Sequence, residues 1–263
     1  MDPRVSVSAV SSWRQPFDAD RALWDRLGVD RVGLSLRKCE EHGLEAAAQA
    51  TADDGRSVSN FVECGWLDLH DPASWQATTE RWHAAIDAFA GFAPWSLVLT
   101  TGAAWQLAWD DAAAALAEAT ASVRAHAVAN GVSVALENTG SLRVDLSFVH
   151  RLADAVDLAA MLDTGVTAEL SSCWAERGID ELLHDSRIVH VQLSDFVVGS
   201  LATPDRAVPG DGDIPLRRLL RALDRAGYAG AYEIEMVGPR IEDEGYERAI
   251  ARAMLAVDAL LAE

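Results

Sequence analysis

The sequence has very little lysine, and its few cysteines are scattered. Lys38 is the only lysine, the other basic side chains are arginines, and the formal net charge is −19 at pH 7. Because this charge repels polyanions, we expect neither DNA nor RNA as a partner. The three cysteines, Cys39, Cys64 and Cys173, are odd in number and far apart. This argues against a disulfide framework and against a CxxC metal site.

Long apolar runs are also missing. No run approaches the roughly 20 apolar residues that cross a bilayer. The first ten residues, MDPRVSVSAV, lack the basic and apolar regions of a secretory signal. We therefore expect a cytoplasmic protein with no membrane partner, folded as a single domain over residues 1–263. The sequence does not distinguish a monomer from a homo-oligomer.

Short strand-like runs alternate with longer, alanine-rich helical runs along the whole chain. We expect strands at residues 5–10, 31–36, 57–64, 95–101, 132–138, 159–164, 188–195 and 231–237. Helices are expected at 18–27, 38–52, 72–89, 110–130, 145–155, 175–184, 215–226 and 244–261. Eight βα units in a chain of this length predict a (β/α)8 TIM barrel of the α/β class. A doubly wound open sheet is the alternative, but its GxGxxG fingerprint is missing.

Polar residues end four consecutive predicted strands in the second half of the chain. They are Glu137 in VALENTG, Asp163 in AAMLDTG, Gln192 in IVHVQLSDF and Glu235 in AYEIEMVG, with spacings of 26, 29 and 43 residues. Each gap holds a strand, a loop and a helix, so the four would meet at the C-terminal face of the barrel. Three crowded carboxylates repel one another unless a cation is present, which predicts one divalent metal site. Ordinary helix capping is the alternative interpretation.

These strand tips resemble the xylose isomerase-like superfamily, in particular its sugar phosphate isomerase/epimerase branch. The resemblance rests on ALEN, LDTG, HVQLSD, PGDGDI (209–214) and YEIE, and it is close only in the C-terminal half. It implies a barrel whose divalent metal is held by Glu, Asp, His and Glu, with proton transfer beside a carbonyl group.

The chain departs from that family in three places. The family usually has histidine where Gln192 stands, lysine where Ser194 stands, and often histidine where Val166 stands, three residues after the metal-binding aspartate. Glutamine still offers an oxygen ligand, as it does in the similar 3-dehydroshikimate dehydratases of the same superfamily. The all-oxygen set favours Mn²⁺ or Mg²⁺, with Co²⁺ and Zn²⁺ as further candidates.

Further residues are candidates for catalysis or substrate binding. His190 lies two residues before Gln192 and therefore points to the same barrel face, either as a catalytic group or as a buried, hydrogen-bonded histidine. In the family, an arginine in the loop that contains Arg206 often contacts substrate. The tryptophans Trp13, Trp66 and Trp105 follow predicted strands and offer faces for a sugar or cyclitol ring. Because lysine is missing from the site region, a neutral or weakly charged small molecule fits better than a phosphate.

Together these features predict an enzyme that enolises its substrate with the help of a metal. Glu137 and Glu235 would transfer the proton, which makes the chain an isomerase or epimerase of a sugar, cyclitol or related keto or hydroxy-carbonyl compound. A dehydratase or lyase, either 3-dehydroshikimate dehydratase-like or glycoside-eliminating, is the alternative. A non-catalytic barrel that binds metal or ligand is a further one. An endonuclease IV-like phosphodiesterase is disfavoured, since it needs many histidine ligands and the chain has 7 histidines.

Overall fold

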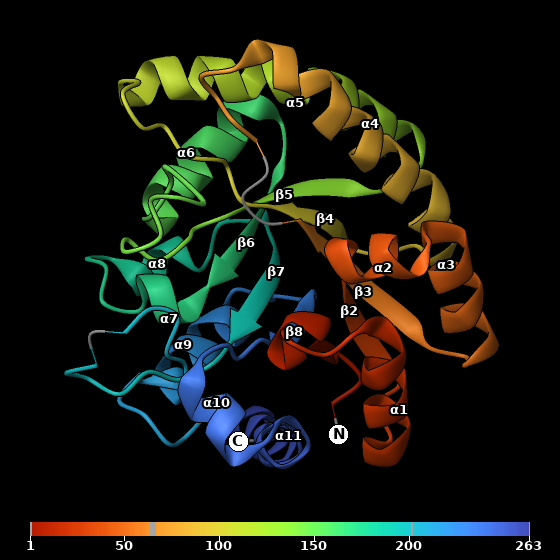
Figure 1. Cartoon of the computed structure of the whole chain (residues 1–263). Helices are drawn as coiled ribbons and strands as arrows, with labels where there is room; N and C mark the ends of the chain where they lie inside the picture. The colour runs from red at the N-terminus through yellow and green to blue at the C-terminus, as the bar shows by residue number, and fades with distance from the viewer. Residues whose placement is uncertain (1, 64–66, 201, 263) are drawn as a thin grey trace.

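The computed structural model describes residues 2–63, 67–200 and 202–262, and in them parallel strands close into a barrel (Figure 1). The strands are β1 (Val5–Ser8), β2 (Arg31–Ser35), β3 (Ser57–Glu63), β4 (Ser96–Leu99), β5 (Ser133–Glu137), β6 (Gly165–Glu169), β7 (Ile188–Leu193) and β8 (Ala231–Ile234). Each strand pairs with the next along the chain, and β8 pairs with β1. The predicted TIM barrel is therefore confirmed.

Helices surround the barrel, as Figure 1 shows. They are α1 (Phe17–Leu27), α2 (Leu36–His42), α3 (Leu44–Asp53), α4 (Pro72–Phe89), α5 (Trp109–Ala129), α6 (Leu152–Leu162), α7 (Leu170–Cys173), α8 (Ile179–Leu182), α9 (Leu216–Arg225), α10 (Pro239–Glu244) and α11 (Tyr246–Leu261), with 3-10 turns η1 (Ala9–Ser12) and η2 (Ala90–Phe92). In the part of the chain that the structure describes, no helix is both long and apolar enough to span a membrane.

The apolar core lies between the strands and the ring of helices. Strand residues such as Leu34 and Phe61 are fully buried, and they belong to the same cluster as Trp24 of α1 and Trp82 of α4. Because strand side chains alternate between two faces, every second residue is free to face the barrel interior instead. Burial of each large apolar side chain stabilises the fold by about 1.5–3 kcal/mol.

The barrel interior carries buried polar groups below the strand tips. Glu233 of β8 accepts a hydrogen bond from Asn60 of β3 (3.3 Å) and lies 3.0 Å from His190 Nε2 of β7. Gly33 of β2 makes room for this group, because a Cβ added there would lie 1.6 Å from Glu233 Oε1. TIM barrel interiors are usually filled by branched apolar side chains, so this polar layer departs from the common pattern of the fold.

The sixth strand differs from the prediction. Residues 159–164 were expected as a strand and 145–155 as a helix, whereas α6 runs from Leu152 to Leu162 and β6 begins at Gly165. Buried residues of α6 recur at helical spacing, which decides its conformation within the folded chain. Asp163 caps the helix in the left-handed region, with φ of 54°. The interpretation of Asp163 as a strand tip is therefore wrong.

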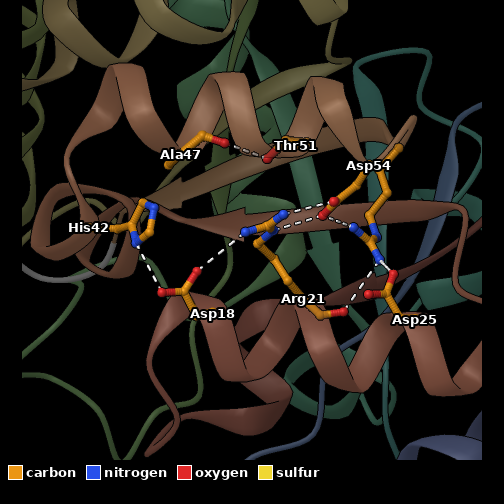
Figure 2. A network of polar contacts seen from close by, with 8 residues as sticks. Asp18, Arg21, Asp25, His42, Ala47, Thr51 and Asp54 are labelled. Carbon is orange, nitrogen blue, oxygen red and sulfur yellow. Dashed lines mark hydrogen bonds and ion pairs between the residues drawn. The ribbon is translucent and has the colours of Figure 1, made fainter.

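A polar network joins α1 to the end of α3 (Figure 2). Arg21 of α1 binds both carboxylate oxygens of Asp54, at 2.7 and 2.8 Å. Arg56 pairs with the same Asp54 and with Asp25. Since Asp54 and Arg56 lie just before β3, their ion pairs lie near the N-terminal ends of the strands, away from the strand tips that carry the candidate site.

Candidate functional site

A cavity of about 740 Å³ opens at the C-terminal ends of the strands. Its lining residues come from the tips of β2, β3 and β5 and from the segments after β1, β2, β4, β5, β7 and β8, and they include Trp13, Glu137, Arg206 and Glu235. Active sites of TIM barrels lie at this face of the fold. The cavity is therefore the place where the predicted site residues have to meet.

Glu137 and Glu235 enter this cavity from different strands. Glu137 ends β5 and accepts a hydrogen bond from Thr139 Oγ1 at 3.3 Å. Glu235 directly follows β8, and its Oε2 accepts hydrogen bonds from Ser8 Oγ and Gln192 Nε2, each at 3.0 Å. Both predicted proton-transfer residues thus line one cavity.

Crowding changes the acidity of these carboxyl groups. Burial, together with the neighbouring Glu169, raises the pKa of Glu137 to about 8. Burial, together with Glu233 and Glu137, also raises the pKa of Glu235 well above its usual range. Carboxyl groups with raised pKa values hold a proton near neutral pH, which is the property a general acid and base pair needs.

The sixth strand places Glu169, and not the expected Asp163, at the C-terminal face beside the cavity-lining Arg206. Asp163 stands before the first residue of β6, at the end of the barrel opposite the cavity, whereas Glu169 is the last residue of that strand. Glu169 is buried, and its Oε1 accepts a hydrogen bond from Ser171 N (2.9 Å) and lies 3.2 Å from Arg206 Nη1. The run GVTAELSS could have predicted a strand that ends at Glu169, because its apolar and polar residues alternate up to the glutamate.

Asn138 fixes the tips of β5 and β6 relative to each other. Its side-chain amide donates to the carbonyl of Glu169 (3.1 Å), and its Oδ1 accepts from the backbone N–H of Glu169 (3.0 Å). Three residues beyond Glu169 stands Ser172. Val166, where the resemblance places a family histidine, lies buried near the start of β6.

Gln192 and His190 lie at different depths on β7. Gln192 is buried and donates to Glu235, and its Oε1 has no hydrogen-bond partner among the described residues. His190 is fully buried beside Glu233, and it is not among the described residues that line the cavity. The structure thus places Gln192 next to the site carboxylates and His190 in the polar layer below them.

The predicted substrate-binding residues are only partly brought together. Trp13 and Arg206 line the cavity, and the guanidinium of Arg37 stacks on the Trp13 ring at 4.6 Å. Trp105 is 63% exposed and does not belong to the described lining of the cavity. Trp66 lies outside the described residues, as does Cys64.

The donor chemistry of the site fits an oxygen-preferring cation. Among residues 2–63, 67–200 and 202–262, no group of three His, Cys, Asp or Glu side chains stands close enough to hold a metal as placed. The candidates are nevertheless three carboxylates, Glu137, Glu169 and Glu235, and the carboxamide of Gln192, whose buried oxygen lacks a partner. Hard divalent cations prefer such oxygen ligands, and a cation would offset the mutual repulsion of the carboxylates.

Comparisons with known proteins agree with this architecture. Inosose isomerase from Halalkalibacterium halodurans is 28% identical over 132 residues, and the match covers 47% of this chain and 46% of that enzyme. The chain therefore spans about half the length of this curated relative in the match.

Solved structures with the same fold cover almost the whole chain. Protein SMc04130 from Sinorhizobium meliloti 1021 has a TM-score of 0.88 at 21% identity, with 98% of both chains covered. The IOLI protein with a binding zinc atom has a TM-score of 0.78 at 16% identity, also with 98% of both chains covered. D-psicose 3-epimerase in the presence of D-fructose has a TM-score of 0.76 at 15% identity, covering 99% of this chain and 100% of the other.

These structural similarities, all at low identity, show a shared fold. The family model described as xylose isomerase-like TIM barrel matches residues 13–256, which is most of the chain. The chain belongs to the xylose isomerase-like TIM barrel family.

Proposed function

We propose that this chain is a divalent-metal-dependent isomerase or epimerase of a sugar, cyclitol or related keto or hydroxy-carbonyl compound. The observation that carries the proposal is that Glu137 and Glu235 line one cavity from the ends of β5 and β8. Gln192 of β7 donates to Glu235, and Glu169 of β6 lies beside the cavity-lining Arg206. Relatives of the fold support it, since they include an inosose isomerase, a D-psicose 3-epimerase and a 3-keto-D-glucoside 4-epimerase.

Glu137, Glu169, Gln192 and Glu235 would hold the metal. When bound, Mn²⁺ or Mg²⁺ would supply Lewis acidity that polarises the substrate carbonyl. The structure of the IOLI protein contains a zinc atom, so Zn²⁺ belongs among the ions to be tested.

The carboxyl groups of this chain would move the proton. Glu137 and Glu235 reach the cavity from β5 and β8, so one of them can take the proton from the carbon next to the carbonyl group. Return of the proton at the neighbouring carbon gives isomerisation, and return to the opposite face of the same carbon gives epimerisation.

Trp13 and Arg206 would bind the substrate. The Trp13 ring lines the cavity and is held by Arg37, and such a face suits the apolar side of a sugar or cyclitol ring. Arg206 lines the same cavity while it pairs with Glu169, so its guanidinium stands ready for a hydroxyl, keto or carboxylate oxygen.

A dehydratase or lyase is the second candidate. By the resemblance, glutamine at position 192 stands where the isomerase and epimerase branch usually has histidine. Removal of the proton next to the carbonyl group gives an enediolate. In a dehydratase or lyase this enediolate would lose a leaving group at the β carbon instead of regaining a proton. Elimination releases water or an alcohol and leaves a double bond, which distinguishes it from isomerisation in a product spectrum.

Metal analysis followed by exchange in D₂O tests the proposal. Purified protein is loaded with Mn²⁺, freed of excess metal and incubated in D₂O with ketoses and cyclitol ketones. We expect one Mn²⁺ per chain and deuterium at the carbon next to the carbonyl, and we expect Glu235→Gln to abolish both.

Asp163→Asn is the matched control. It changes a carboxylate at the other end of the barrel, and asparagine also tolerates the left-handed conformation that this residue adopts. It should therefore keep the metal and the exchange. If the wild-type protein binds no divalent metal, the proposal is wrong. If it binds metal and ligand without deuterium exchange, it is a non-catalytic barrel that binds its ligand.

A further inference from the structure

The single lysine of the chain is buried beside the turn that follows β1. Lys38 of α2 and Asp20 of α1 form an ion pair of 2.6 Å, and both side chains have no exposed surface. The Lys38 ammonium also donates to the carbonyl oxygens of Ala9 (2.7 Å) and Ser12 (3.0 Å). All three N–H donors of the lysine are therefore used, and two of them bind the backbone of η1.

Asp20 completes the cage around this turn. Its Oδ1 accepts from Ser12 Oγ at 2.5 Å, and its Oδ2 accepts from Lys38. A compact ammonium suits acceptors that converge on one point, whereas the planar guanidinium of arginine needs a wider arrangement. This geometry accounts for a lysine at this position in a chain whose 22 basic residues are otherwise arginines.

The opposite side of the same turn is attached to the end of β8. Ser8 Oγ donates to Glu235 Oε2 at 3.0 Å. Ser11 Oγ donates to the carbonyl of Ile234 (3.1 Å) and accepts from the backbone N–H of Met236 (3.0 Å). Ile234 and Met236, which flank Glu235, are thus hydrogen-bonded to Ser11 of η1. The Glu235 carboxylate is hydrogen-bonded to Ser8, the residue directly before η1.

We propose that Lys38 and Asp20 are a positioning pair that holds η1 so that Ser8 and Ser11 orient Glu235 toward the cavity. The role of Glu235 itself rests on the proposed function, but the connection from the buried pair to the end of β8 does not. Buried ion pairs contribute little net stability compared with well-packed apolar residues, and in some proteins they instead specify one arrangement of the groups around them. Replacing the pair by apolar side chains therefore distinguishes the two roles: stability is kept, whereas the positioning of Glu235 is lost.

The double variant Lys38→Met/Asp20→Leu makes that separation. Since the two replacements are apolar and of similar size, the fold is expected to survive, which thermal unfolding checks. We expect backbone amide exchange in residues 9–12 and at Met236 to rise at least tenfold, and Mn²⁺ affinity in titration calorimetry to fall at least tenfold.

Arg21→Met is the matched control. It breaks the paired contacts of Arg21 with Asp54 (Figure 2), which involve neither η1 nor β8, so it lowers stability and leaves Mn²⁺ affinity and exchange at Met236 as in the wild type.

Three results overturn the inference. They are wild-type exchange at Met236 in the double variant, wild-type Mn²⁺ affinity in that variant, and an equal loss of affinity in the Arg21→Met control. If the wild-type protein takes up no Mn²⁺, the proposed function fails by itself, and exchange at residues 9–12 and Met236 still decides for or against the positioning pair.

Discussion

Glu137→Gln is expected to stabilise the metal-free protein above pH 7 while it removes the metal site. Burial and Glu169 raise the pKa of Glu137 from 4.5 to about 8, so the folded chain keeps a proton that the unfolded chain has already released. The free energy of unfolding then falls as pH rises through this range, by about 1.4 kcal/mol per pH unit for one proton. Over the whole range the loss is at most about 5 kcal/mol. Glutamine is neutral at every pH, so the variant lacks this loss.

Urea unfolding in EDTA between pH 5 and pH 9 measures this effect. The curves of wild type and Glu137→Gln should lie close together at pH 5 and separate progressively toward pH 8. Glu118→Gln on the exposed side of α5 is the control, because an exposed carboxylate shows no such separation. Added Mn²⁺ should stabilise the wild type and not Glu137→Gln. Parallel curves for wild type and Glu137→Gln over the whole range would refute the reasoning from burial and crowding.

Three further predictions follow from contacts around the site. Gly33→Ala should cost at least about 2 kcal/mol in urea unfolding, because the new Cβ overlaps Glu233 Oε1, and Glu233→Ala in the same chain should recover part of it. Asp195→Ala should cost about 3 kcal/mol, since three backbone N–H groups lose their acceptor; a cost equal to that of an exposed aspartate would contradict this. Arg206→Gln should bind Mn²⁺ several-fold more tightly in calorimetry, because Arg206 competes for Glu169, and unchanged affinity would show no competition.

Most of the fold followed from local patterns in the sequence. The predicted strand ranges contain β1, β2, β4, β5, β7 and β8, and β3 coincides with 57–63 of the range 57–64. The predicted helices 72–89 and 110–130 also have local causes at one end. The Asp71 carboxylate caps α4 ahead of Pro72, and Gly131, with φ of 70°, follows the end of α5. Gly43 divides the predicted helix 38–52 into α2 and α3, because it leaves the helical region with φ of 98°.

The sixth strand shows where local patterns fail. The short apolar run before Asp163 suits a buried strand and the last turn of a helix equally well. Only the packing of α6 against the barrel distinguishes the two, since its buried residues continue at helical spacing from Leu152 to Leu162. Because of this error, the prediction assigned the ligand of the sixth strand to Asp163, which lies at the end of the barrel opposite Glu169.

Arg206 and His190 show the same division within the site. The sequence placed Arg206 in the long loop after strand seven, but its approach to Glu169 depends on how that loop folds back over the cavity. The sequence also placed His190 and Gln192 on one face of β7, since side chains alternate along a strand. Their different surroundings, Glu233 for the one and Glu235 for the other, arise from the register between β7 and β8.

The sequence by itself determined the barrel, because strand periodicity and spacing act over short stretches of chain. It also predicted the C-terminal face as the candidate site and three of the four candidate ligands. The tertiary structure decided the rest. Which carboxylate completes the set, which groups have raised pKa values, and what holds the turn beside Glu235 all depend on burial and on contacts between residues far apart in the chain. Those contacts exist only once the barrel has closed.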